Sequence, residues 1–210
     1  MHHSLEVKRS AQLYTLGELN TQTQYVWVVL HGYAQHPGFW IRKCACLIQL
    51  PLTAVVAPEG LSKFYVAGQS GRVGASWMTS DNRNQEITDY IGYLTEVRKW
   101  IVAQAPHAKI VLLGFSQGGA TAARVAAATP TDWENLVLWS AVFPPDMPTS
   151  QLDKLSGWMV YGKADPYLST EIQMEIQRAS YWPNFEKVVF EGGHDLDEAC
   201  LSVLQQKIQA

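Results

Sequence analysis

A serine placed between glycines directly after a short apolar run constrains the fold more than any other feature of the sequence. The string Gly-Phe-Ser-Gln-Gly at 114–118 follows the apolar residues 110–113. A G-x-S-x-G string at a strand end is typical of a sharp strand-to-helix turn that exposes the serine hydroxyl. The alanine-rich segment that continues to Ala128 favours a helix packed closely on a sheet. The pattern therefore predicts a strand, a tight turn bearing Ser116, and a helix.

The rest of the chain alternates strand-like runs with helix-like segments. The runs are continuously apolar, which indicates strands covered on both faces, as in a parallel sheet. Strands are expected at 25–30, 53–57, 109–113, 136–139, 158–161 and 187–190, with an edge strand or hairpin at 5–9 and 12–16. Helices are expected at 84–104, 120–128, 170–178 and 197–209, with capping pairs Asn82–Gln85 and Asp195–Glu198 at the first and last. This alternation predicts a single α/β domain over residues 1–210, with a mostly parallel central sheet flanked by helices and no large lid.

Bulk properties exclude several classes of protein. The net charge of −3 and the isoelectric point near 6.1 give no reason to bind nucleic acid. No run approaches the roughly 18 apolar residues that span a bilayer, and the N-terminus lacks the apolar core of a signal peptide. The three cysteines, Cys44, Cys46 and Cys200, form neither a disulfide framework nor a zinc-binding spacing. We therefore expect a cytoplasmic protein with free thiols, no metal site and no integral membrane segment.

Chemically active residues follow several of the expected strands at one edge of the sheet. Ser116 comes after the third central strand, Asp165 after the fifth and His194 after the sixth. Ligands of an open parallel sheet bind beyond the carboxyl ends of its strands, and the order serine, acid, histidine is that of an α/β-hydrolase triad. We therefore expect Ser116 as nucleophile, His194 as the base that takes its proton, and Asp165 as the acid that orients the base. Asp146 and Asp195 are the rival acids.

The tetrahedral intermediate of acyl transfer needs hydrogen-bond donors for its oxyanion. The backbone N–H of Gln117 is the first expected donor, and the second comes from Tyr33 or Ala34 in the loop after the first central strand. We expect His31 to shape this loop rather than to carry protons. The glycine-rich stretch 68–74 lacks the strand-then-helix setting of a nucleotide loop and is expected to form a mobile rim loop.

Bulky apolar residues on the expected rim loops are candidates for the acyl pocket. The alternative for each of them is a place in the core, since aromatic side chains dominate protein interiors. The absence of a long insertion predicts an open groove. The residues selected as substrate-binding are Phe39, Trp40, Trp77, Phe143, Tyr167 and Leu168, and further candidates are Tyr33, Phe64, Tyr65 and Met78.

These motifs resemble the phospholipase/carboxylesterase family of α/β-hydrolases, which includes the acyl-protein thioesterases. The resemblance extends from about Tyr25 to the C-terminus, and the string Gly-Phe-Ser-Gln-Gly-Gly at 114–119 is its most specific part. Its other motifs are Leu30-His31-Gly32, Ala75-Ser76-Trp77, Gly162-Lys163-Ala164-Asp165-Pro166 and Gly193-His194. The resemblance implies a small single-domain serine esterase with little or no lid and no metal or organic cofactor. The chain has Tyr-Ala-Gln at 33–35, where the family usually has Leu-Gly and an acid, and Trp-Met-Thr at 77–79, where many relatives have an aromatic–acid pair.

Together these features predict a serine hydrolase that cleaves carboxylic esters with a short or medium acyl chain through an acyl-enzyme. The alternatives are an acyl-thioesterase or lysophospholipase that uses the same residues, and a non-catalytic ligand-binding protein on the hydrolase scaffold. The expected partner is a small-molecule ester, and an exposed apolar groove would also suit a homodimer contact.

Overall fold

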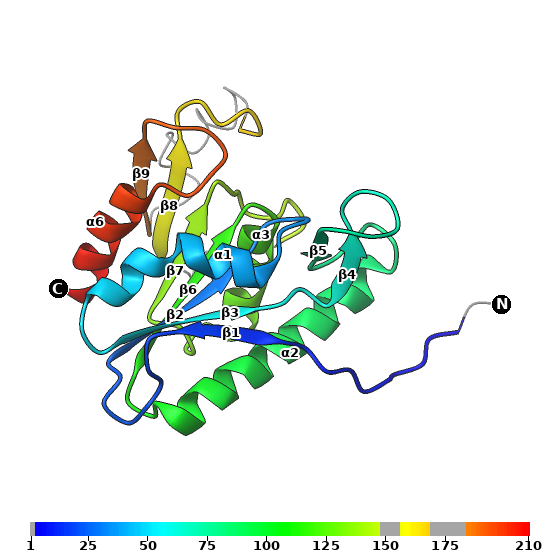
Figure 1. The fold of residues 1–210 in the computed structure, drawn as a ribbon, viewed down its shortest axis with the longest axis horizontal. Coiled ribbons are helices and arrows are strands. Elements are labelled where there is room, and N and C mark those ends of the chain that lie inside the picture. The colour runs from blue at the N-terminus through cyan, green and yellow to red at the C-terminus, as the bar shows by residue number, and fades with distance from the viewer. Residues whose placement is uncertain (1–2, 148–155, 169–183) are drawn as a thin grey trace.

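The centre of the molecule is a seven-stranded sheet (Figure 1), and the computed structural model describes residues 3–147, 156–168 and 184–210. The strands are β1 (Leu13–Leu16), β2 (Tyr25–Leu30), β3 (Thr53–Pro58), β6 (Lys109–Phe115), β7 (Asn135–Trp139), β8 (Gly157–Gly162) and β9 (Phe185–Phe190). Their order in the sheet is β1-β3-β2-β6-β7-β8-β9. β1 pairs antiparallel with β3, and the other neighbouring pairs are parallel.

Helices cover both faces of this sheet (Figure 1). They are α1 (Pro37–Lys43), the 3₁₀ helix η1 (Ala45–Gln49), α2 (Arg83–Gln104), α3 (Gln117–Ala128) and α6 (Glu198–Gln209). Successive side chains of a strand point to opposite faces, so Val26 and Val28 of β2 join a core cluster with α2 and α3. Trp27 and Val29 join a second cluster with α1, η1 and α6. Each large apolar side chain that is fully buried stabilises the fold by about 1.5–3 kcal/mol, and the continuous apolar runs supply such side chains to both faces.

The predicted fold class is confirmed. All six expected central strands form, and their ends differ from the expected ones by at most two residues. β1 is the expected edge strand, whereas residues 5–9 are exposed and form no regular structure. The helix expected at 170–178 lies outside the described residues.

Both capping predictions are wrong. Asn82 precedes α2, but it adopts a left-handed conformation with φ 49°, and its side chain makes no capping hydrogen bond. Side-chain caps normally come from residues with extended backbone. Asp197 rather than Asp195 caps α6, because the helix begins at Glu198 and the Asp197 carboxylate accepts a hydrogen bond from the Cys200 N–H at 2.7 Å.

A two-stranded hairpin beside the main sheet has no counterpart in the sequence predictions. It pairs β4 (Ser62–Tyr65) antiparallel with β5 (Val73–Ser76). The glycine-rich stretch 68–74 is therefore the tip of a hairpin and the start of β5, rather than a loop throughout. Gly68 and Gly71 lie in the tip at φ 70° and 97°, a region of backbone conformation that favours glycine.

Candidate active site

Ser116 lies on a tight turn between β6 and α3. Its backbone has φ 53° and ψ −119°, a conformation that is strained for a residue other than glycine and recurs at functional sites. Two glycines leave room for the turn. A Cβ on Gly118 would lie 2.5 Å from the Leu30 carbonyl oxygen, and a Cβ on Gly114 would overlap the Gly118 carbonyl. The turn therefore places a half-buried serine just beyond the carboxyl end of β6.

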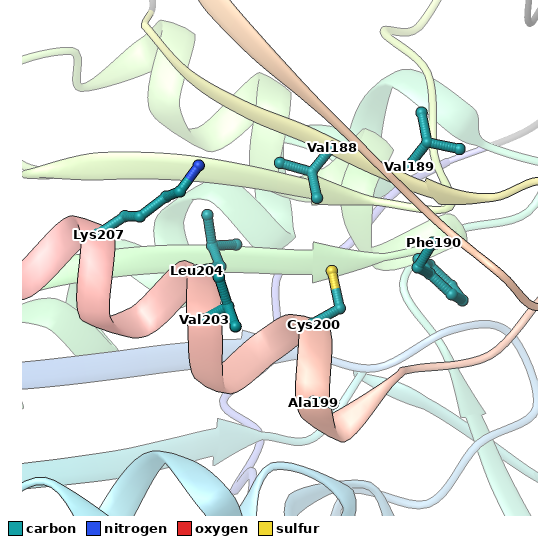
Figure 2. A pocket seen from close by; sticks show the side chains of 8 residues that line it. All are labelled: Val188, Val189, Phe190, Ala199, Cys200, Val203, Leu204 and Lys207. Atoms are coloured by element: carbon teal, nitrogen blue, oxygen red, sulfur yellow. The ribbon is translucent and has the colours of Figure 1, made fainter.

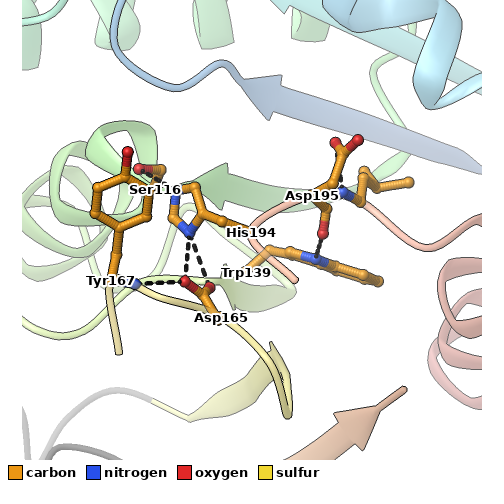
Figure 3. A network of polar contacts seen from close by, with 7 residues as sticks. Ser116, Trp139, Asp165, Tyr167, His194 and Asp195 are labelled. Carbon is orange, nitrogen blue, oxygen red and sulfur yellow. Dashed lines mark hydrogen bonds and ion pairs between the residues drawn. The ribbon is translucent and has the colours of Figure 1, made fainter. Parts of the chain in front are cut away.

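The residue predicted as base lies within hydrogen-bond distance of both the predicted nucleophile and the predicted acid (Figure 3). His194 Nε2 lies 2.9 Å from Ser116 Oγ, and His194 Nδ1 lies 2.8 and 3.0 Å from the two Asp165 carboxylate oxygens. The Asp165 side chain is fully buried, whereas the His194 side chain keeps 18% of its surface exposed. A carboxylate is an acceptor, so the proton of a neutral His194 resides on Nδ1. Nε2 is then left to accept the Ser116 hydroxyl proton.

Asp195, one of the two rival acids, is engaged elsewhere. Its carboxylate forms an ion pair with Lys43 at 2.5 Å. Its backbone carbonyl accepts a hydrogen bond from the Trp139 indole N–H at 3.0 Å (Figure 3). The residue next to His194 in the sequence thus anchors the loop that carries the histidine, and its carboxylate is directed away from the ring.

Asp146, the other rival, is held by two arginines. Its Oδ1 lies 2.8 Å from the Arg83 guanidinium and 2.7 Å from that of Arg124. Partial burial works to raise the pKa of Asp146, but the hydrogen bonds from Arg83 and Arg124 outweigh it and lower this pKa to about 2. Asp146 is therefore a structural carboxylate between α2 and α3.

The hydrogen bonds of the loop after β2 distinguish between its two expected oxyanion donors, Tyr33 and Ala34. Gly32 N–H donates to the Gln35 side chain at 2.8 Å, and Gln35 N–H donates back to the Gly32 carbonyl at 3.2 Å. Ala34 N–H donates to the Ala75 carbonyl of β5 at 2.9 Å, which removes it from the expected oxyanion donors. Among the described residues, no acceptor is found for the Tyr33 N–H. Of the two expected donors, Tyr33 is therefore the one whose N–H remains available.

Gln117 contributes more than the amide that the sequence predicted. Its N–H lies in the first turn of α3, where an amide has no acceptor within the helix. Its side chain accepts from the Trp77 N–H at 3.1 Å and donates to the Met78 carbonyl at 2.8 Å. Sequence reasoning missed this link, because no local pattern pairs Gln117 with residues that far away. The side chain fixes the serine turn to the segment after β5.

His31 is a structural residue of the loop after β2. It is fully buried, its Nε2 accepts from the Gly60 N–H at 3.0 Å, and its Nδ1 lies 2.8 Å from the Gly32 carbonyl. Because Nε2 is the acceptor, the proton resides on Nδ1 and the ring is neutral. Desolvation by burial lowers the pKa of His31 from 6.5 to about 4.

This histidine makes stability depend on pH. An unfolded chain takes up a proton at His31 below pH 6.5, while the folded chain resists protonation until about pH 4. The stabilisation is therefore complete above pH 6.5 and is lost as the pH falls towards 4. We expect the free energy of unfolding to fall by about 2 kcal/mol from this group between pH 7 and 4.5. Urea titrations of wild type and His31→Gln measure the difference, and a variant with an undiminished pH dependence would contradict the assignment.

Four of the six residues selected as substrate-binding are buried, which corrects the expectation that they line an open groove. Trp40 and Phe39 are neighbours on α1, which the sequence analysis took for a loop. The helix turns Trp40 towards the sheet, where its ring stacks on Phe115 with centroids 5.0 Å apart. Phe39 and Tyr167 stay 61% and 73% exposed. The four buried residues are Trp40, Trp77, Phe143 and Leu168.

Two cavities lie away from the three hydrogen-bonded residues. One, of about 270 Å³, lies between β9 and α6 and is lined mainly by apolar side chains (Figure 2). The other, of about 290 Å³, opens beside Arg124 and Asp146. Cys200 lines the first, and burial raises the pKa of its thiol to about 11. A thiol that stays protonated at neutral pH is a poor nucleophile, so Cys200 does not rival Ser116.

Within residues 3–147, 156–168 and 184–210, no three His, Cys, Asp or Glu side chains are grouped so that they could hold a metal ion. Over the same ranges, no helix has the length and apolar character needed to cross a membrane. The three cysteines are free thiols.

Known proteins resemble this chain in family and in fold. The family model described as Phospholipase/Carboxylesterase matches residues 18–210. Acyl-protein thioesterase 2 of Zea mays superposes with a TM-score of 0.69 at 16% identity, covering 95% of this chain and 98% of that one. The Bacillus cereus carboxylesterase gives 0.66 at 14% identity, with 95% and 93% covered. A phospholipase/carboxylesterase from Dyadobacter fermentans gives 0.66 at 18% identity, with 98% and 99% covered.

A comparison with curated protein sequences gave no match. At these identities the solved structures establish the fold alone, and the family model establishes the family, since it covers nearly the whole chain. The serine turn, the hydrogen-bonded histidine and the acid all fall within the matched residues. The chain therefore belongs to the phospholipase/carboxylesterase family and is a hydrolase of the carboxylesterase/thioesterase type.

Proposed function

We propose that Ser116, His194 and Asp165 form a catalytic triad that hydrolyses carboxylic esters. The observation that carries this proposal is the unbroken path of hydrogen bonds from Ser116 Oγ through the imidazole to the buried carboxylate, with steps of 2.9 and 2.8 Å. Three residues far apart in the sequence meet in the geometry that proton transfer needs. Membership of the phospholipase/carboxylesterase family supports this proposal.

The proposed reaction has two halves. His194 Nε2 takes the hydroxyl proton while Ser116 Oγ bonds to the carbonyl carbon of the ester, and the Asp165 carboxylate stabilises the imidazolium that forms. The oxyanion lies between the N–H groups of Tyr33 and Gln117. The imidazolium then gives its proton to the leaving alcohol, and the acyl group stays on Ser116. In the second half a water molecule gives a proton to His194 while its oxygen bonds to the acyl carbon. The bond from that carbon to Ser116 Oγ then breaks, the imidazolium returns its proton to Oγ, and the carboxylic acid is released.

We propose esters with a short or medium acyl chain as the substrates. Four of the six candidate pocket side chains are packed in the core, which leaves fewer apolar side chains to line a groove for a long acyl chain. The second candidate is thioester hydrolysis, which the likeness to the Zea mays acyl-protein thioesterase favours. Lysophospholipid hydrolysis is a third use of the same residues. The cytoplasmic location and a homodimer stay predictions from the sequence.

A fluorophosphonate probe and a substrate panel test this proposal. We expect the probe to label Ser116, as identified by mass spectrometry of the labelled peptide. We expect p-nitrophenyl acetate and butyrate to be turned over faster than the palmitate, and faster than acyl-thioesters of matched length. Faster cleavage of the thioesters would show that the second candidate, thioester hydrolysis, is the better description of the function. An unlabelled protein that still binds esters would be a ligand-binding protein on the hydrolase scaffold.

A further inference from the structure

One exposed residue contacts two members of the proposed triad. The ring of Tyr167 lies against the imidazole of His194, with centroids 4.5 Å apart and planes at 57° (Figure 3). The backbone N–H of the same residue donates to Asp165 Oδ1 at 3.0 Å. Tyr167 therefore holds the acid with its main chain and touches the base with its side chain.

The contact with Asp165 fixes the direction of the carboxylate. Oδ1 lies 3.0 Å both from His194 Nδ1 and from the Tyr167 N–H, and Oδ2 lies 2.8 Å from His194 Nδ1. The acid side chain has no exposed surface, so water does not compete for these bonds. A short turn, two residues long, thus ties the position of the aromatic ring to that of the acid.

The contact with His194 concerns the charge that forms during the reaction. When the imidazole takes the serine proton it becomes a cation, and aromatic rings within about 6 Å attract cations through their π electrons. A second ring, that of Phe115, lies 4.9 Å from the imidazole. Phe115 is buried, whereas the Tyr167 side chain is 73% exposed. Tyr167 is therefore the ring that can be removed at little cost to folding.

We propose that Tyr167 is a positioning residue for this hydrolase rather than part of the acyl pocket. Its ring restricts the swing of the His194 imidazole and stabilises the imidazolium, and its N–H orients Asp165. This inference rests on the triad proposed above. Tyr167 is thus expected to affect kcat, whereas the sequence alone predicted that it binds the substrate.

Three substitutions at Tyr167 separate these roles with p-nitrophenyl acetate as substrate. We expect Tyr167→Phe to stay within twofold of wild type, since the ring remains. We expect Tyr167→Ala and Tyr167→Leu to lower kcat about 10-fold, through loss of alignment, with KM within twofold.

The controls distinguish this role from a structural one. Trp100 on α2 is also an exposed aromatic residue, at 39%, and Trp100→Ala should leave kcat and KM unchanged. Thermal unfolding of the Tyr167 variants should stay close to wild type. A raised KM with an unchanged kcat would indicate that Tyr167 binds the substrate in the acyl pocket, and would overturn the proposal. A Tyr167→Phe variant as slow as Tyr167→Ala would also overturn it. Failure of the fluorophosphonate to label wild-type protein would instead overturn the triad itself.

Discussion

Ser116→Ala is expected to abolish ester turnover, with a loss in kcat of about 10⁵- to 10⁶-fold and little change in stability. The substitution removes only Oγ, the atom that lies 2.9 Å from His194 Nε2. Alanine keeps the Cβ, so the strained backbone at φ 53° is no worse for it than for serine. The rate of p-nitrophenol release from p-nitrophenyl butyrate measures the loss, and the fluorophosphonate should no longer label the protein.

A second serine provides the matched control. Ser202 lies on α6, where its hydroxyl donates to the Glu198 carbonyl within the helix. Ser202→Ala should keep wild-type turnover and labelling. Wild-type rates in Ser116→Ala, with the protein folded by circular dichroism, would show that another residue is the nucleophile.

Asp165→Asn is expected to lower kcat by about 10⁴-fold while leaving the protein folded. An amide can present its NH₂ to His194 Nδ1, which then becomes the acceptor and leaves the proton on Nε2. In that tautomer Nε2 cannot take the Ser116 proton. Loss of the carboxylate also removes the charge that stabilises the imidazolium. Steady-state kinetics at pH 7–9 measure the effect.

Asp146→Asn is the matched substitution on the rival acid. It should leave kcat within a few-fold of wild type, because Asp146 contacts Arg83 and Arg124 and not His194. Its expected cost is in thermal stability, since Arg124 is nearly buried and loses its charged partner. A large fall in kcat for Asp146→Asn, with a small one for Asp165→Asn, would move the acid to the loop after β7.

The central sheet follows from local sequence because its strands are continuously apolar and flanked by helical patterns. Runs such as Tyr25–Leu30 have no alternative to burial on two faces. The hairpin of β4 and β5 could not be predicted from local sequence. Its strands are four residues each, and β4 alternates exposed with half-buried positions. Its pairing depends on contacts with the rest of the fold rather than on its own composition. Helix α1 could not be predicted either, because a seven-residue helix is too short to show a helical periodicity of apolar residues.

The candidate site also has parts that local sequence predicts and parts that it does not. The order of Ser116, Asp165 and His194 along the chain predicts their meeting, since each follows a parallel strand that ends at one edge. Local sequence does not reveal the hydrogen bond from Ala34 N–H to β5. That bond decides which of the two expected amides in the loop after β2 remains free. Burial of the pocket candidates is likewise undecided by residue type, because the same aromatic side chains fill cores and line grooves.

The attachment of the hairpin to the loop after β2 has a mechanical consequence. Ala34 N–H donates to the Ala75 carbonyl and Ala75 N–H donates to the Gln35 carbonyl, at 2.9 and 3.0 Å. Gly74 lies so close to Ala34 that even a methyl group would collide with its backbone. These contacts hold the two segments together, with the exposed bend of the hairpin at one end and the amide of Tyr33 at the other. A displacement of that bend would therefore also move the amide proposed as an oxyanion donor.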